Sequence, residues 1–524
     1  MKSTLLRLGV FHHRIGVVPV VHALLTIRQT RRTIVPLSSR YYQQKRFAPR
    51  SGMTLSSSIL RSSSSSSSNC HDTTTAAPAA AAGLAHRLDG LDQPTVWQEF
   101  SPLATQYNSI NLGQGFPDWD PPNFVVEAMK RSIDPTFGRN ANQYARSYAH
   151  MPLATVLAQE YTHRWQQSKL PSHLLPLDPT TQIATATGVT NVLYCALQGL
   201  INPGDQVVLL EPYFDIYSSQ VQMAGGECVY CPLRPDTSAV GASDVFTLDL
   251  DELESKLSTQ TRVLILNTPH NPTGKMFNHE ELQGIANLVS KYPQLVVISD
   301  EVYEHIVFDT VNEPHLSIAT INNGQIWHQT LTMSSAGKTF SCTGWKVGWA
   351  VGPSHLVKAV TSVQQWCNFS PTTPTQDAIA QALQTAREEP YQGYPTYYDW
   401  LASDYRHKRQ LLVDALLVAG MKPIVPNGGF FIMADTQHVD FPYDDIANTQ
   451  LSTAMPGYAT GKKMPRDWAL SRWLTQTVGV TAIPPSAFYS LDTVDLAANT
   501  LRFAFCKGES TLQQAKQRFE TYFT

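Results

Sequence analysis

The sequence predicts an α/β fold in which a mostly parallel sheet, flanked by helices, is joined to a smaller α+β domain. Short runs of aliphatic and β-branched residues recur from residue 207 onward, and each is long enough for one buried strand. Stretches with helical periodicity separate these runs, as the connections between parallel strands require. Beyond residue 388 the alternation becomes irregular, so the C-terminal part is expected to form the smaller domain.

The individual elements follow the same patterns along the chain. Buried strands are expected at 207–210, 263–266, 295–299, 330–333 and 347–351. Helices are expected at 191–200, 279–290 and 375–387, and two strands of the smaller layer at 428–431 and 501–505. We therefore divide the chain into an N-terminal arm with part of the small domain (85–136), a large domain (137–388) and a C-terminal small domain (389–524).

The bulk composition favours small-molecule chemistry. The chain has 524 residues, of which 42% are hydrophobic and 15% charged, as expected for two globular domains and a tail. A net charge of -3 gives no electrostatic reason to expect nucleic acid or an anionic membrane as partner. No stretch approaches the ~20 apolar residues of a spanning helix. Seven scattered cysteines, with Cys228 and Cys231 on opposite sides of a predicted strand, predict neither a metal site nor a disulfide framework.

Residues 1–84 have the composition of a transit peptide. No acidic residue precedes Asp72, whereas eight arginines occur by residue 50. The serine run 62–68 and the Ala/Thr-rich segment 73–82 bury too little apolar surface to fold, so we expect disorder there. A mitochondrial address fits this pattern best. A plastid address, or a cytoplasmic product that starts at Met53, stays open as an alternative.

Lys338 is the strongest indication of chemistry. It lies in the run Ser-Ser-Ala-Gly-Lys-Thr-Phe, among small residues, and Lys346 follows eight positions later. Such a lysine is suited to a Schiff base with an aldehyde cofactor, and the second cation to the phosphate of that cofactor. A phosphate-binding P-loop would need glycine at Thr332, and a penicillin-binding S-x-x-K enzyme would need a Ser-Asp-Asn that the chain lacks. A solvated surface lysine is the ordinary alternative.

Polar residues follow several of the predicted strands, where ligands gather in α/β sheets. Asp300 and Tyr303 come directly after the strand at 295–299, and Asn271 is held extended by the proline that follows it. Gly188 opens a predicted helix, whose first N–H groups attract a phosphate. Arg502 is flanked by apolar residues in a strand pattern, which suggests a buried guanidinium that needs an anion. Taken singly, these residues would more often be a helix start, a turn and an edge-strand arginine.

Together these motifs resemble the class I/II aminotransferases, whose cofactor is pyridoxal phosphate and whose architecture is fold type I. The resemblance rests on the Lys338 segment and on the run Asn-Thr-Pro-His-Asn-Pro-Thr-Gly that contains Asn271. It implies that Lys338 binds the cofactor and that Asp300 pairs with the protonated pyridine nitrogen. It also implies that Tyr303 and Asn271 contact the phenolic oxygen, and that Asn271 and Arg502 bind the substrate carboxylate. The remaining cofactor contacts that it implies are Gly188, Val189, Thr190, Phe214, Ser335 and Lys346.

The N-terminal part resembles one branch, the kynurenine aminotransferases, which are also called glutamine transaminase K or cysteine-S-conjugate β-lyase. The matching runs are His-Arg-Leu-Asp-Gly-Leu at 86–91, Asn-Leu-Gly-Gln-Gly-Phe-Pro-Asp at 111–118 and Asn-Gln-Tyr at 142–144. This resemblance implies that Gly115 binds the substrate carboxylate, that Trp97 and Phe369 shape the side-chain pocket, and that Tyr144 reaches the phosphate of a neighbouring subunit. A homodimer is therefore expected. Ser370 stands where some members have histidine, which affects the expected specificity.

The expected activity is transamination between an amino acid and a 2-oxo acid. Kynurenine, giving kynurenic acid, and glutamine, aromatic or sulfur amino acids are the expected donors. The alternatives are elimination from cysteine conjugates, another class I aminotransferase activity, or a catalytically silent binding protein with this fold. The last would be expected to have lost Lys338, Asp300 or Arg502, and all three are present.

Overall fold

The computed structural model describes residues 84–236, 239, 241–309, 314–449, 452–457 and 461–524, and all of them belong to one compact unit. The predicted leader lies outside the described residues, apart from its last position. None of the described helices is both long and apolar enough to cross a bilayer.

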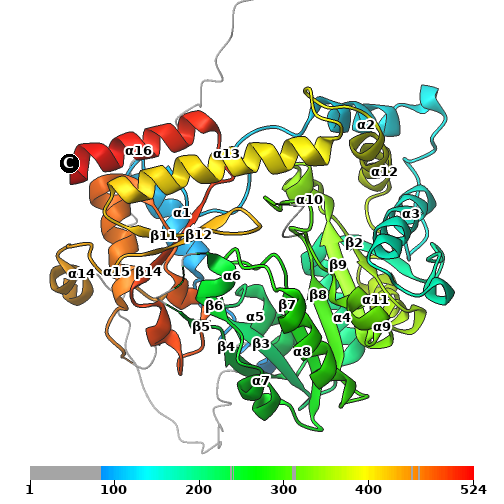
Figure 1. Cartoon of the computed structure of the whole chain (residues 1–524), viewed down its shortest axis with the longest axis horizontal. Helices are drawn as coiled ribbons and strands as arrows, with labels where there is room; N and C mark the ends of the chain where they lie inside the picture. Colours follow the sequence, from blue (N-terminus) through cyan, green and yellow to red (C-terminus); the bar gives the residue numbers. More distant parts are fainter. Residues whose placement is uncertain (1–83, 237–238, 240, 310–313, 450–451, 458–460) are drawn as a thin grey trace, which may run out of the picture. The chain divides into compact units, whose positions relative to one another are not determined.

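A seven-stranded sheet in the order β2-β10-β9-β8-β7-β3-β4 forms the larger part (Figure 1). Its strands are β2 (Ile183–Thr187), β3 (Gln206–Glu211), β4 (Glu227–Pro232), β7 (Thr261–Asn267), β8 (Val296–Asp300), β9 (Thr330–Ser335) and β10 (Val347–Val351). From β4 to β9 all neighbours are parallel, whereas β10 is antiparallel to both β9 and β2. Only residues 336–346 separate β9 from β10. Because a parallel return needs a crossover of about a dozen residues or more, the chain turns back antiparallel there.

Helices cover both faces of this sheet, as the continuous apolar runs predicted. In β3, Val207 and Leu209 pack in the cluster formed with α4 (Val189–Leu200), α5 (Ile216–Met223) and α11 (Ser354–Cys367). The alternate residues Val208 and Leu210 pack in a second cluster with α7 (Leu250–Lys256) and α8 (His279–Ser290). Such a strand cannot alternate polar and apolar residues, because neither of its faces meets water.

The smaller part is built on an antiparallel sheet of β11 (Lys422–Ile424), β12 (Phe431–Asp435) and β14 (Thr500–Ala504). The helices α13 (Tyr397–Val418) and α16 (Glu509–Phe523) lie side by side over it (Figure 1). The N-terminal segment joins this part, since β1 (Ile110–Asn111) pairs with β13 (Val480–Thr481) and α1 (Val96–Gln106) packs beside them. A capping box between Thr95 and Gln98 fixes the start of α1.

The strand expected at 428–431 begins only at its last residue, Phe431, so that prediction was wrong for Gly428, Gly429 and Phe430. Gly429 has a φ of +72°, and a Cβ on Gly428 would lie 2.7 Å from the ring of Pro269. The glycine pair therefore forms a close bend against the loop after β7 rather than a strand. This bend turns the two following phenylalanines toward the region between the sheets.

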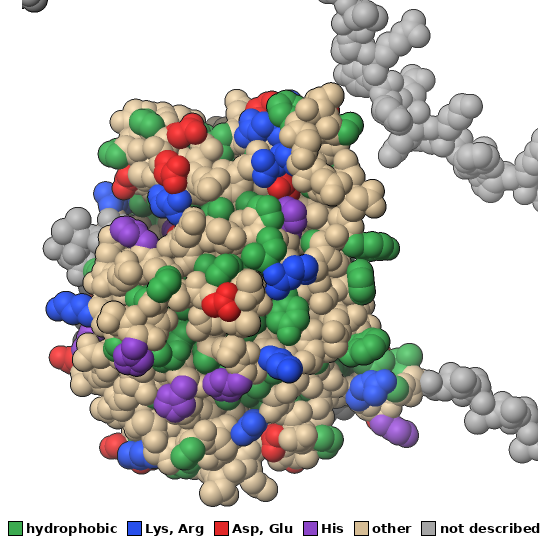
Figure 2. Space-filling view, turned by 90° about the vertical axis from the view of Figure 1, so that its right-hand side faces the viewer, with side chains coloured by type: hydrophobic (Ala, Val, Ile, Leu, Met, Phe, Trp, Pro, Cys, Tyr) green, Lys and Arg blue, Asp and Glu red, His purple; other side chains and the backbone are tan. Residues whose placement is uncertain are grey.

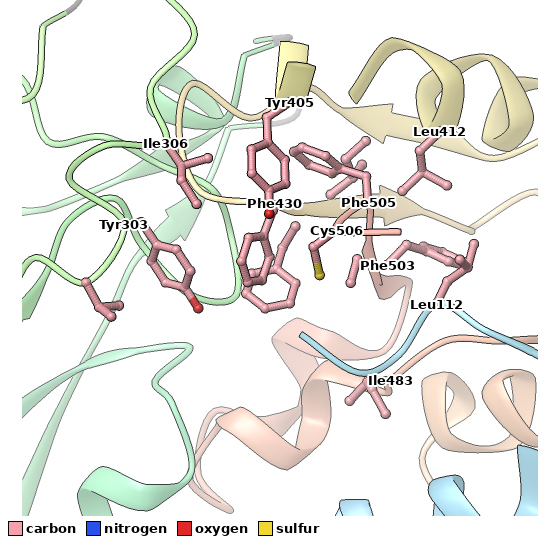
Figure 3. Close-up of a cluster of buried hydrophobic side chains, with 14 of the residues drawn as sticks. Leu112, Tyr303, Ile306, Tyr405, Leu412, Phe430, Ile483, Phe503, Phe505 and Cys506 are labelled. Atoms are coloured by element: carbon pink, nitrogen blue, oxygen red, sulfur yellow. The ribbon is translucent and has the colours of Figure 1, made fainter. Parts of the chain in front are cut away.

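An aromatic cluster fills that region (Figure 3). Tyr303, from the loop after β8, meets Phe430 edge to face with ring centroids 5.0 Å apart. Tyr405 of α13 stacks on the other side of Phe430 at 6.0 Å, and Phe505 and Cys506 continue from β14. Residues far apart in the sequence thus hold Tyr303 in one orientation.

Candidate active site

A cavity of about 360 Å³ opens where the carboxyl ends of β7, β8 and β9 meet loops of the smaller part. All but two of the predicted site residues line it, namely Trp97, Gly115, Gly188, Val189, Thr190, Phe214, Asn271, Asp300, Tyr303, Ser335, Lys338, Lys346 and Arg502. They come from both parts of the fold and from the N-terminal segment. The structure therefore brings together residues that lie up to 405 positions apart in the sequence, as Trp97 and Arg502 do.

Lys338 lies on α10 (Ala336–Thr339), the short turn that follows β9, and its side chain points into the cavity. Its Nζ donates a hydrogen bond of 2.7 Å to the carbonyl oxygen of Gly115. A Cβ on Gly115 would lie 2.4 Å from the ring of Phe431, so only glycine allows the chain to pass this close. Burial lowers the pKa of the Lys338 ammonium to about 8. The amine is therefore partly neutral near pH 8 and available as a nucleophile and a base.

Asp300 ends β8 and is buried at the bottom of the cavity. Its Oδ2 accepts a hydrogen bond of 2.8 Å from the Tyr217 hydroxyl, and its Oδ1 accepts one of 3.3 Å from the Val302 N–H. Burial raises the pKa of Asp300 to about 6, although these two hydrogen bonds act to lower it. A buried carboxylate with only neutral donors is suited to a cationic partner in the cavity.

Tyr217 is a site residue that was not predicted from the sequence, since the motif that predicted Phe214 was not extended beyond it. Tyr217 lies three residues later, at the start of α5, and both side chains line the cavity. Helix periodicity places such residues on one face, and that signal could have identified the tyrosine. Burial raises the pKa of Tyr217 and of Tyr303, so both phenols keep their protons and can donate hydrogen bonds.

The start of α4 and the start of β10 form a cradle suited to a phosphate. Gly188 has a φ of +78°, and a Cβ there would lie 3.2 Å from the Lys346 side chain. A Cβ on Gly348 would lie 2.4 Å from the backbone of Gly188 and Val189, so this second glycine lets β10 approach the helix. The first-turn N–H groups of Val189 and Thr190, together with the Lys346 ammonium and the Ser335 hydroxyl, face the cavity as donors to an anion.

Arg502 is 1% exposed, so the alternative of an edge-strand arginine in solvent is wrong. Its Nη1 donates to Asn271 Oδ1 at 3.0 Å and its Nη2 to the Gly113 carbonyl at 2.7 Å. Among the described residues, its buried Nε has no hydrogen-bond partner. Burial lowers the pKa of this guanidinium to about 10. A buried guanidinium bound only to neutral acceptors is suited to a carboxylate ligand.

Two predicted residues, Tyr144 and Phe369, do not line the cavity of their own chain. Their side chains are 84% and 57% exposed, and their rings meet edge to face with centroids 5.2 Å apart. The roles expected for them therefore need a surface beyond this chain, and they stay predictions.

Comparison with known proteins identifies the family. The model of the family described as aminotransferase class I and II matches residues 107–519. The chain belongs to this family. It is 42% identical to a kynurenine–oxoglutarate transaminase of Dictyostelium discoideum, over 80% of this chain and 92% of the relative. It is 39% identical to the human kynurenine–oxoglutarate transaminase 3, over 83% of this chain and 89% of the relative. The resemblance drawn from the sequence motifs is confirmed.

A solved structure shares the architecture. The Saccharomyces cerevisiae protein Bna3p superposes with a TM-score of 0.74 at 29% identity, over 84% of this chain and 99% of that one. The predicted α/β fold of type I aminotransferases is therefore confirmed. Membership of this family implies pyridoxal phosphate as cofactor and amino and 2-oxo acids as substrates.

The cavity fits this cofactor on its own chemistry. Asp300 offers a buried negative charge to a protonated ring nitrogen, and the start of α4 with Lys346 offers donors to a phosphate. The Lys338 amine lines the same cavity and can bind an aldehyde. The cavity thus offers one partner for each of three polar groups of pyridoxal phosphate. The carboxylate suits the ring nitrogen, the cradle with Lys346 suits the phosphate, and Lys338 suits the aldehyde.

Glu301, next to Asp300, gives a stability prediction for this region. It is fully buried, and Ser299 and Ser317 donate to its Oε1 at 2.9 and 2.7 Å. Burial and the neighbouring charge of Glu304 raise the pKa of Glu301 to about 8. The folded protein therefore holds a proton that the unfolded chain releases above about pH 4.5.

We expect Glu301→Gln to remove this dependence. Stability from the retained proton is fully present below about pH 4.5 and is lost as pH rises through about 8. The free energy of unfolding of the variant should therefore rise relative to that of the wild type over this window, by on the order of 4 kcal/mol. Thermal unfolding of both proteins at pH 5 and pH 8 measures the difference. Glu280→Gln, at an exposed position of α8, is the matched control. A difference that does not vary with pH contradicts the prediction.

Proposed function

We propose that this aminotransferase transfers the amino group of kynurenine, and of glutamine, aromatic or sulfur-containing amino acids, to a 2-oxo acid. The observation that carries the proposal is that three aromatic rings surround the guanidinium of Arg502. The centre of its guanidinium lies 4.2 Å from the ring centroid of Phe431, 5.0 Å from that of Phe488 and 5.2 Å from that of Trp97. A carboxylate bound there leaves the rest of the amino acid against flat apolar walls. The kynurenine transaminases among the relatives support the same choice.

The cavity residues would hold pyridoxal phosphate as follows. Asp300 binds the protonated pyridine nitrogen, Tyr303 and Asn271 donate to the phenolic oxygen, and Phe214 stacks on the ring. The phosphate is bound by Gly188, Val189, Thr190, Ser335 and Lys346. When bound, the cofactor supplies an aldehyde that links covalently to an amine and a ring that accepts the electron pair left when a Cα–H bond breaks.

The chain supplies the carboxylate clamp and the proton transfer. Arg502 and Asn271 bind the α-carboxylate of the amino acid, which fixes the direction of the Cα–H bond. The Lys338 amine would remove the α-proton and return it to the carbon that the aldehyde supplies, which is two bonds from Cα, beyond the amino nitrogen. Because burial keeps its pKa near 8, this amine can accept and release a proton at neutral pH. The same groups then serve the 2-oxo acid in reverse, so two-step kinetics without a ternary complex are expected.

A donor panel tests the proposal, and Trp97→Ala sharpens it. The wild type should use kynurenine and phenylalanine better than aspartate. The variant should lose about 10- to 100-fold in kcat/KM for these flat donors and much less for alanine, because it removes a wall of the side-chain pocket. Aspartate as the best donor of the wild type, or an equal loss for every donor, contradicts the assignment and leaves only the general aminotransferase activity.

Arg502→Lys should weaken all amino donors alike. Lysine keeps the charge but cannot form two parallel hydrogen bonds to a carboxylate, so kcat/KM should fall by about 10- to 100-fold for aromatic and small donors equally. Steady-state kinetics with phenylalanine and alanine measure this, and the cofactor absorption band should stay unchanged. A loss confined to one donor would show that Arg502 contacts the side chain instead.

We also propose that two chains form a homodimer that completes each site. Exposed aromatic side chains favour it, since Tyr144 and Trp366 are 84% and 85% exposed. Hydrophobic side chains also emerge between polar ones on the face that carries α2 (Asn123–Ile133), α3 (Met151–Gln167) and α12 (Thr373–Glu388) (Figure 2). Light scattering should give twice the mass of one chain. A monomer with full activity contradicts this proposal.

We propose a mitochondrial location from the leader composition. A fluorescent protein fused after residue 84 should be imported into mitochondria, and a fusion that begins at Met53 should not. Import into plastids, or a cytoplasmic signal from the full leader, contradicts it.

A further inference from the structure

Asp215 is a buried acid beside the cavity that the mechanism above does not use. It directly follows Phe214 and precedes the first residue of α5, but its side chain does not cap that helix. Its Oδ2 instead accepts a hydrogen bond of 2.7 Å from Nε1 of Trp97, which belongs to α1. Its Oδ1 is buried, without a hydrogen-bond partner in the described part of the chain. This bond joins the N-terminal segment to the loop that follows β3.

The indole of Trp97 contacts two groups of opposite charge. Its ring centroid is 5.2 Å from the guanidinium centre of Arg502, and its Nε1 is bound to Asp215. Burial raises the pKa of Asp215, while the hydrogen bond from Trp97 and the charge of Arg502 lower it. No carboxylate of the described residues forms an ion pair with Arg502, and the charge of Asp215 acts through space to raise the pKa of this guanidinium, against the burial that lowers it.

This arrangement affects any ligand bound at Arg502. Charges in a buried site are screened weakly, so the negative charge of Asp215 acts across the indole on groups next to the guanidinium. Arg502 itself neutralises one carboxylate of the ligand. Arg502 is the only arginine among the described residues that line the cavity, so a second carboxylate on a ligand bound there would meet the charge of Asp215.

We propose that Asp215 is a positioning and specificity-determining residue, whose Oδ2 fixes the Trp97 indole against Arg502 and whose charge disfavours a second carboxylate on the substrate. The inference deepens the proposed function and rests on it only in that Arg502 binds a carboxylate. A purely structural aspartate would affect both kinds of ligand equally. The two parts of the role can be separated, because asparagine keeps the hydrogen-bond acceptor and removes the charge.

Binding of two unreactive acids to the cofactor-loaded full chain tests this. Maleate carries two carboxylates and 3-phenylpropionate carries one, and neither has an amino group to react. Their dissociation constants are measured from the change in cofactor absorption. In Asp215→Asn, maleate should bind about tenfold more tightly relative to 3-phenylpropionate than in the wild type, as expected for removal of one charge at this range. In Trp97→Phe, which keeps the charge and loses the N–H, both acids should weaken by a similar factor, so that their ratio stays that of the wild type.

Glu227→Gln is the matched control, because it removes an exposed acid. Glu227 lies at the amino end of β4, whereas Asp215 follows the carboxyl end of β3. Its ratio should equal that of the wild type. An unchanged ratio in Asp215→Asn, or a shift toward maleate in Trp97→Phe of equal size, overturns the proposal. If Asp215→Asn does not accumulate, Asp215→Ser removes the same charge and carries the same expectation. The ratio needs no turnover, so failure of kynurenine as donor would contradict the proposed function alone.

Discussion

Replacement of Lys338 by alanine should abolish amino-group transfer while the cofactor can still bind. The amine lines the same cavity as Asp300 and Arg502, and it donates a hydrogen bond of 2.7 Å to the Gly115 carbonyl. Loss of both the nucleophile and the proton carrier should lower kcat by about 10³-fold or more. Single-turnover absorption with phenylalanine measures the loss, and retention of the phosphate cradle should leave cofactor bound without a covalent link.

Borohydride reduction of the wild type followed by peptide mapping gives a readout that does not depend on turnover. The label should be found on Lys338. Lys358→Ala, at an exposed position of α11, is the matched control and should keep both activity and label. A label on another lysine, or turnover in Lys338→Ala close to that of the wild type, contradicts the assignment.

The sequence was most informative where function depends on strand ends. Asp300 and Lys338 both follow buried strands that could be recognised from apolar runs alone, and β8 and β9 are parallel neighbours. Parallel neighbours present their carboxyl ends at one edge, so residues just beyond them must lie close together. The same argument could not supply Tyr217 or Asp215. Their contacts, with Asp300 and with Trp97, join segments that lie far apart in the sequence.

Strand direction and surface roles were harder to predict. The apolar run of β10 looks like that of a parallel strand, because both kinds are buried on two faces in this sheet. Only the short connection from β9 distinguishes them. Tyr144 and Phe369 depend on a second surface, so neither pattern nor single-chain geometry can test their roles.

Asp300→Asn should lower turnover by about 10²-fold or more, because an electrostatic partner placed at a developing charge contributes several kcal/mol. Asparagine keeps an acceptor for the Tyr217 hydroxyl, which now donates at 2.8 Å, so the fold around the site should persist. The lost function is the negative charge that keeps a proton on the pyridine nitrogen. Pre-steady-state absorption should therefore show slower removal of the α-proton, with little change in KM.

The pH dependence provides an independent check on Asp300. Burial raises the pKa of this carboxyl to about 6 in the protein without cofactor, so the charge that would bind the ring nitrogen is lost as pH falls through this value. Cofactor affinity of the wild type should thus weaken below about pH 6, and that of Asp300→Asn should not show this step. Tyr217→Phe removes a hydrogen bond that favours the charged form, so its step should move to higher pH. Equal pH profiles for wild type and Asp300→Asn, together with near-normal turnover, would place the ring-nitrogen partner elsewhere.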